Sequence, residues 1–188
     1  ENGESQEQSF TRVCLDMLTQ VNETYNAVVA YDEKGLGTKG QHKINGYAIT
    51  ENCDTIDLLI SIFTPSDNIE SIEKAQIDRG CTRITNFFSK SFFYNYENEV
   101  AETSSIFEFA HQLATSQSIR NNLIRVNAFI LTNNRYKGEI PLPKEVNGHK
   151  IFYNIIDIDK LYSISAQSRL PIQLDLTEHN IMPPCLPI

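Results

Sequence analysis

The sequence predicts a mixed α/β protein in which helices pack on the faces of one β-sheet. Helical and strand-like patterns are interleaved along the 188 residues, and this order favours a sheet covered by helices over an all-helical or all-strand architecture. Hydrophobic residues make up 40% of the chain, which is enough for the core of one domain of this length. We find no internal repeat and no linker between two cores, so we expect a single domain over residues 1–188.

The first element is a helix of about residues 5–22. Ser5 and Gln8 have the spacing of a capping box, in which each side chain satisfies a backbone amide of the other residue. Apolar residues then recur at the spacing of one helical face. The residues of this face are Phe10, Val13, Cys14, Met17, Leu18 and Val21.

Three strands are predicted next, at residues 27–33, 43–50 and 55–63. All three are rich in β-branched and aromatic residues, and Pro65 closes the third. The "GLGTKG" between the first two has the G-x-G-x-x-G spacing of a dinucleotide-binding loop. That motif requires a helix after it, whereas "QHKINGYAI" alternates as a strand. We therefore predict a hairpin loop here and no nucleotide site.

Two helical patterns and two further strands follow. The first helix is predicted over residues 69–89, and the second begins at a predicted capping box of Ser105 and Glu108. Strand character returns in "NLIRVNAFILT" and "KIFYNIID", with a polar loop or irregular hairpin between them. A short helix in "DIDKLYSIS" and a strand in "PIQLDL" complete the order. The expected buried faces of the two longer helices consist of Ile77, Cys81, Ile84 and Phe88, and of Ile106, Phe109, Ala110 and Leu113.

Charge and cysteine spacing exclude several function classes. The formal net charge of −8 argues against broad, sequence-independent binding of nucleic acid. The four cysteines show no zinc-site spacing, and a reducing, cytoplasmic compartment fits them best. We expect neither a membrane span nor a leader peptide. The Glu1 start and the "PPCLPI" end lead us to expect a piece of a longer protein.

The helix followed by three strands is an arrangement used by many metal-dependent nucleases. Their sites need carboxylates on the second and third strands, and an acid and a lysine two residues apart on one face of the third. On the third strand Asp57 and Ser61 share a face with Phe63, and no lysine follows an acid there. The position expected for the first acid, on the second strand, holds the neutral Asn45. The catalytic pattern is therefore incomplete.

Three acids stay open as candidates for a nuclease that uses Mg²⁺ or Mn²⁺. Glu7 lies on the first helix, and Asp54 and Asp57 lie near the turn before the third strand. An exposed helical glutamate and ordinary turn aspartates explain them equally well. We otherwise expect no metal site and no cofactor.

A mildly basic region with an aromatic residue lies around residues 120–150. It is the best place for contact with a nucleic acid or an acidic partner, although a solvated loop explains it too. The candidates are Arg120, Arg125, Arg135, Tyr136, Lys137 and Lys144.

Several segments resemble the N-terminal domain of the abortive-infection phage-resistance proteins, called AIPR. They are "FTRVCLDMLTQVNE", the strand pair "INGYAITENCDTIDLLISIF" with Gly46, Tyr47 and Phe63, and "RVNAFILTNN" followed by "IFYNIIDIDKLYSI". The resemblance implies a restriction-endonuclease-like core within a larger bacterial protein, in which this domain precedes the main AIPR region and serves in phage defence. The chain departs from an active nuclease at Asn45, Ser61 and Phe63.

Our leading hypothesis is therefore a degenerate, noncatalytic nuclease-like domain that senses, docks or regulates within a phage-defence protein. The first alternative is an active metal-dependent nuclease. The second is a protein-interaction or dimerisation module. The expected partner is the C-terminal AIPR region of the same polypeptide. Other protein partners, a homodimer and a nucleic acid, which the net charge does not indicate, stay open as further possibilities.

Overall fold

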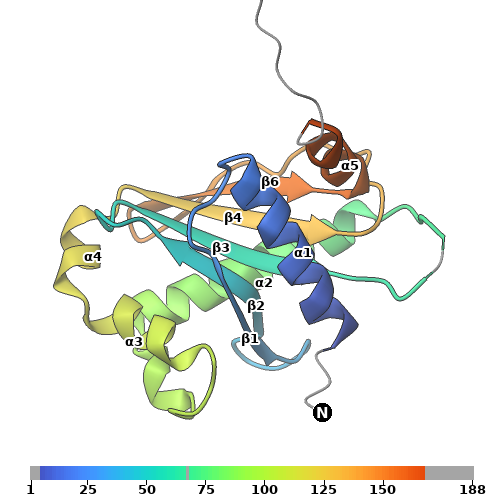
Figure 1. The fold of residues 1–188 in the computed structure, drawn as a ribbon. Coiled ribbons are helices and arrows are strands. Elements are labelled where there is room, and N and C mark those ends of the chain that lie inside the picture. The colour runs from blue at the N-terminus through green and yellow to red at the C-terminus, as the bar shows by residue number, and fades with distance from the viewer. Residues whose placement is uncertain (1–4, 67, 168–188) are drawn as a thin grey trace, which may run out of the picture.

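Residues 5–66 and 68–167, which the computed structural model describes, form a mixed sheet with helices on both faces (Figure 1). The sheet has six strands in the order β1-β2-β3-β4-β6-β5. Their bounds are β1 Val28–Lys34, β2 His42–Ile49, β3 Thr55–Ile62, β4 Arg125–Thr132, β5 Lys144–Val146 and β6 His149–Ile156.

The pairing divides the sheet into an antiparallel and a parallel half. β1, β2 and β3 form an antiparallel meander. β3, β4 and β6 run parallel, and the short β5 closes the far edge in antiparallel pairing with β6. The predicted α/β class is confirmed, and this arrangement is compatible with the restriction-endonuclease-like core that the sequence suggested.

Two groups of helices cover the two faces (Figure 1). On one face α1, Gln6–Gln20, and α5, Ile158–Gln167, enclose a cluster with Leu59, Phe129 and Leu131. On the other face a larger cluster joins the sheet to three helices. These are α2 Lys74–Phe93, α3 Phe107–Thr115 and α4 Gln117–Asn122, and a 3-10 turn at Tyr96–Glu99 lies between α2 and α3.

The predicted capping box of α1 is confirmed. Ser5 Oγ accepts from the Gln8 N–H, and Gln8 Oε1 accepts from the Ser5 N–H. Cys14 and Leu18 are buried under the helix as expected, but Val13 is 56% exposed. Val13 lies at the margin of the apolar stripe and faces the groove between α1 and α5 rather than the sheet.

The predicted start of α2 is wrong by five residues. The helix begins at Lys74 rather than at residue 69, because the segment before it pairs with the chain after β4. The Ile72 N–H donates to the Arg135 carbonyl, and the Arg135 N–H donates to the Glu70 carbonyl. This tertiary pairing overrides a local helical pattern. The predicted buried face of Ile77, Cys81, Ile84 and Phe88 is confirmed.

The predicted capping box at Ser105 is wrong. α3 begins at Phe107 without a side-chain cap, and Ser105 Oγ instead accepts from the Tyr31 N–H of β1. The helix ends at Thr115, and a separate α4 starts under the cap provided by Ser116, a break that the sequence analysis did not predict. The predicted face of Ile106, Phe109, Ala110 and Leu113 is fully buried.

The remaining loops have the conformations that their turn residues predict. "GLGTKG" connects β1 to β2 as the predicted hairpin loop. The polar segment before β6 contains the short β5 and a tight turn in which Asn147 and Gly148 adopt φ values of 46° and 88°, as this Asn-Gly turn type requires. The predicted strand of residues 171–176 lies outside the described residues. None of the helices in residues 5–66 and 68–167 combines the length and apolar character that a membrane crossing needs.

Candidate functional site

β2 and β3 separate at the end of the sheet where β2 begins and β3 ends. Their backbone pairing runs from Ile49 and Ile56 to Gly46 and Leu59. Beyond that point the backbones of the two strands no longer pair. Side chains of β2 instead form hydrogen bonds with the backbone N–H and the backbone carbonyl of Ser61. Asn45 Oδ1 accepts from the Ser61 N–H at 2.9 Å, and Lys43 Nζ donates to the Ser61 carbonyl at 2.9 Å.

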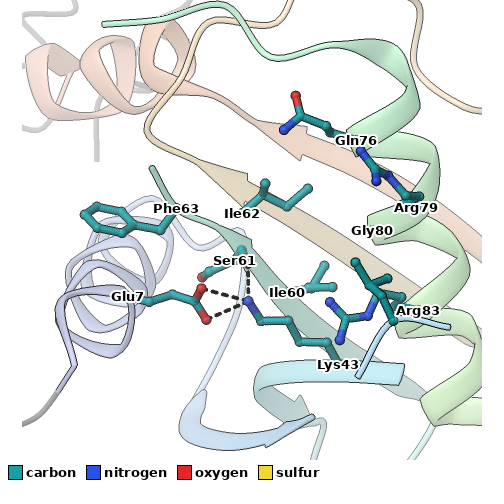
Figure 2. Close-up of a pocket in the computed structure, with 11 residues that line it drawn as sticks. Glu7, Lys43, Ile60, Ser61, Ile62, Phe63, Gln76, Arg79, Gly80 and Arg83 are labelled. Carbon is teal, nitrogen blue, oxygen red and sulfur yellow. Dashed lines mark hydrogen bonds and ion pairs between the residues drawn. The ribbon is translucent and has the colours of Figure 1, made fainter. Parts of the chain in front are cut away.

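Glu7, in the first turn of α1, completes this network (Figure 2). Lys43 Nζ lies 2.7 Å from its carboxylate oxygens. Asn45 Nδ2 donates to Glu7 Oε1 at 2.7 Å. The Ser61 hydroxyl lies 2.7 Å from the Thr11 hydroxyl, which also donates to the Glu7 carbonyl. One carboxylate, one ammonium and one amide therefore meet at the end of the strands that holds Asn45 and Ser61.

Burial explains why position 45 holds an amide. Asn45 is 1% exposed and Lys43 is 8% exposed, so their polar atoms need partners inside the protein. Asn45 accepts from Ser61 and donates to Glu7 at the same time. An ionised aspartate could accept but not donate, and it would bring a second negative charge against Glu7.

A pocket of about 300 Å³ opens beside this network (Figure 2). Glu7 and Lys43 line one side of it, and α2 provides the other side with Gln76, Arg79 and Arg83. The helix approaches closely at Gly80, where an added Cβ would lie 3.0 Å from Ile62 Cδ1. The remaining lining residues are Leu36, Ile60, Ser61, Ile62 and Phe63.

Arg83 is the most buried arginine of the pocket. It is 9% exposed, and its Nη2 donates to Glu33 Oε1 at 2.6 Å and to the His42 carbonyl at 3.0 Å. Burial opposes the ionisation of Glu33, but hydrogen bonds from Tyr31 and Arg83 outweigh it and hold the pKa of Glu33 below its usual range. Within the described chain, Arg83 Nε is buried and has no hydrogen-bond partner.

The structure does not bring the other two candidate acids to Glu7. Asp57 lies toward the opposite end of β3, where it accepts from Thr24 Oγ1 at 2.8 Å and from Asn127 Nδ2 at 2.7 Å. Burial raises the pKa of Asp57, and these hydrogen bonds only partly oppose the shift. Asp54 accepts from Thr50 Oγ1 in the turn between β2 and β3. In the part of the chain that the structure describes, no three His, Cys, Asp or Glu side chains form a group that could hold a metal ion.

The basic candidates are spread along the molecule rather than gathered in one patch. Arg120 donates to the Ala114 and Phe92 carbonyls, which fixes α4 to its neighbours. Arg125 begins β4, whereas Arg135 lies in the segment after the strand ends at Thr132 and pairs with Asp159. Of the others, Lys144 begins the edge strand β5, Tyr136 donates to the Glu139 carbonyl, and Lys137 is exposed.

Sequence reasoning missed Lys43, Arg79 and Arg83. Two signals were available in the sequence. Lys43 precedes Asn45 by two residues, which places both side chains on one face of a strand. Arg79 and Arg83 are four residues apart, which makes them neighbours on one face of a helix. That this face would lie across from Glu7 depends on the packing of the helix.

Comparison with known proteins places the chain in a family. No curated protein and no solved structure matches it. The family model of the abortive infection phage resistance protein N-terminal domain matches residues 10–163. This range contains Lys43, Asn45, Ser61 and both pocket arginines, and Glu7 lies just before it. The chain belongs to this family, and is the N-terminal domain of an abortive-infection phage-resistance protein.

Proposed function

We propose that this domain is noncatalytic and serves the phage-defence protein by sensing, docking or regulation at a nuclease-like site. The network of Glu7, Lys43, Asn45 and Ser61 is the observation that supports this proposal. It occupies the end of the strands where a nuclease of this type would hold its metal. Such a domain would act in the bacterial cytoplasm, where Cys14, Cys53 and Cys81 stay reduced.

The donor set at this site is poor for Mg²⁺ or Mn²⁺. Such ions are held by several oxygen ligands, among which carboxylates carry the compensating charge. Both oxygens of Glu7 are engaged by Lys43 and Asn45, and the lysine already neutralises the carboxylate. In our proposal the domain therefore works without a metal cofactor.

A cleavage assay tests the proposal against the metal-dependent nuclease. The chain would be incubated with plasmid and with single-stranded DNA in Mg²⁺ or Mn²⁺, and metal binding would be measured by calorimetry. We expect neither cleavage nor metal binding. Robust cleavage that is lost in Glu7→Gln and kept in Glu102→Gln, an exposed carboxylate away from the pocket, would overturn the proposal.

A groove between α1 and α5 supports docking as a second role. Its cavity volume is about 630 Å³. Among its lining residues Val13, Ile69 and Tyr162 are 56%, 59% and 76% exposed, and clustered exposed apolar side chains mark interaction sites. We propose that the C-terminal AIPR region of the same polypeptide packs against this groove.

Binding between separately produced parts tests this second role. Val13→Glu should weaken binding of the C-terminal region about tenfold or more, because it places a charge in an apolar contact. Leu142→Glu, at a side chain that is 86% exposed and outside the groove, serves as the control. A concentration-dependent mass of the domain alone, abolished by Val13→Glu, would assign the groove to a homodimer instead.

A further inference from the structure

The pocket between α1 and α2 is more cationic than the protein as a whole. In the described structure its lining contains Lys43, Arg79 and Arg83 and a single carboxylate, that of Glu7, although the chain carries a formal net charge of −8. Lys43 neutralises Glu7 at 2.7 Å, so the carboxylate repels an approaching anion only weakly. Arg83 is paired with Glu33 at 2.6 Å, so Arg79 is the arginine of the pocket that has no carboxylate partner among the described residues.

Arg79 and Arg83 have unused donors that point to a ligand. Within the described residues no carboxylate forms an ion pair with Arg79, whose Nε donates only to the Ala75 carbonyl of its own helix. Arg83 is more than nine-tenths buried, and its Nε has no hydrogen-bond partner there. The Arg83 Nε has almost no exposed surface, so a ligand in the pocket would bind the terminal nitrogens of the two guanidinium groups.

The spacing of the two arginines favours one ligand between them. Four residues apart on α2, they place like charges side by side, and Glu33 forms an ion pair only with Arg83. Figure 2 shows both side chains on the α2 side of the hollow, across from Lys43 and Glu7. Guanidinium groups match the tetrahedral oxygens of phosphate with paired N–H donors.

We propose that this pocket binds a terminal phosphate group through Arg79 and Arg83. The inference rests on the proposed noncatalytic function and names a ligand for the same site. A phosphate monoester suits the site better than an internal phosphodiester, because the cavity is small and the rest of the chain repels a long polyanion. The group could come from a free phosphate compound or from the 5′ end of a nucleic acid.

Calorimetry with the 188-residue chain at fixed ionic strength tests the proposal. The probes are inorganic phosphate, a 5′-phosphorylated single-stranded oligonucleotide and the same oligonucleotide with a 5′-hydroxyl. We expect phosphate to bind and the 5′-hydroxyl strand to bind far more weakly than any phosphorylated probe. Binding of the 5′-phosphorylated strand at least as tightly as inorganic phosphate would assign a nucleic-acid end, and binding of inorganic phosphate alone would assign a small molecule.

Matched substitutions separate the pocket from general charge. Arg79→Gln changes an exposed residue and should weaken phosphate binding about tenfold or more. Arg125→Gln removes the same charge at the other end of the sheet and should change it less than about twofold. Glu7→Gln removes the carboxylate that lines the pocket and should tighten binding severalfold, provided that circular dichroism shows a folded chain.

Two results would overturn the inference. One is the absence of phosphate binding by the folded wild-type chain. The other is an equal loss of binding in Arg79→Gln and Arg125→Gln. Neither result would contradict the noncatalytic proposal, because that proposal fails only if the chain cleaves DNA with a metal ion. The two proposals can therefore fail independently.

Discussion

At the scale of single residues, Asp57 shows how a candidate catalytic acid can be structural. It is 8% exposed and accepts hydrogen bonds from Thr24 and Asn127. Asp57→Ala should lower the free energy of unfolding by about 1–3 kcal/mol, because the buried Thr24 and the half-buried Asn127 lose their acceptor. Asp57→Asn should cost much less, since its amide can accept from Asn127 and donate to the Thr24 hydroxyl. Urea unfolding measures both, and equal losses would contradict this role.

The raised pKa of Asp57 also predicts a pH dependence. The folded chain keeps the proton of this carboxyl to a higher pH than the unfolded chain does. Stability from this group is therefore greatest at low pH and is lost as the pH rises from the ordinary aspartate pKa through the folded value. The difference in unfolding free energy between wild type and Asp57→Asn should shift in that direction as the pH rises above about 4, the ordinary aspartate pKa.

Gly46 is a second residue whose environment fixes its identity. A Cβ at this position would lie 2.9 Å from the Val28 carbonyl oxygen of β1 and 3.5 Å from Leu15 of α1. Gly46→Ala should therefore destabilise the fold by about 1–3 kcal/mol, since backbone cannot move aside cheaply. Gly35→Ala is the matched control, because nothing lies within 4 Å of its Cβ position. Similar unfolding free energies for the two variants would refute the close approach.

The same strand explains the glycine-aromatic pair that resembles the family pattern. The ring of Tyr47 stacks on Phe109 of α3 with centroids 3.9 Å apart and planes 5° from parallel. The missing side chain of Gly46 thus allows Leu15 of α1 and the Val28 carbonyl of β1 to lie close to β2. Tyr47 packs against α3 on the other face of the sheet. The pair connects both helical layers to β2.

At the scale of elements, the start of α1 positions Glu7 in the candidate site. Ser5→Ala removes the capping box and should lower the free energy of unfolding by about 1 kcal/mol. Ser9→Ala, at an exposed position inside the same helix, should be neutral or slightly stabilising because alanine is the better helix former. Thermal unfolding compares the two. A loss in Ser9→Ala as large as in Ser5→Ala would show that the cap is not the cause.

The elements also show where the sequence was informative. The bounds of α1, β1, β2, β3 and β6 agree with their predicted ranges within about two residues, because period and cap residues are local properties. The start of α2 was wrong because Ile72 pairs with Arg135, which is far away in the sequence. The interruption between α3 and α4 was missed because Ser116 was not recognised as a cap.

In the candidate site, too, local patterns were visible in the sequence, whereas long-range packing was not. Counting strand faces singled out Asn45 and Ser61 as departures from the pattern of an active nuclease, and the structure joins the two residues by a hydrogen bond. The lysine was sought on β3, whereas Lys43 reaches the site from β2. Arg83 arrives from a helix on the opposite face of the sheet, and no local pattern specifies such packing.

At the scale of the whole molecule, the net charge of −8 should dominate the response to salt. Exposed ion pairs such as that of Lys74 and Asp78 contribute little, so self-repulsion is the larger effect at low ionic strength. Raising NaCl from about 0.01 M to about 0.15 M should increase the thermal midpoint, because the screening length falls from about 30 Å to about 8 Å.

Charge reversal far from the pocket provides a control for this effect. Lys150→Glu, at an exposed position beside β5, makes the chain more negative and should steepen the increase of the midpoint with salt. A midpoint that falls as NaCl is added would show that attractive ion pairs outweigh the repulsion.

The parallel pairing of β3 with β4 has a consequence for synthesis on the ribosome. Asp57 and Asn127, which lie side by side in the finished sheet, are 70 residues apart in sequence. At ordinary translation rates β4 emerges roughly 4 to 14 s after β3. During that interval the nascent meander presents β3 as an open apolar edge, which is the surface that misassembly exploits. The parallel half of the sheet therefore cannot begin to form before β4 emerges, and protection of β3 by a chaperone matters most until then.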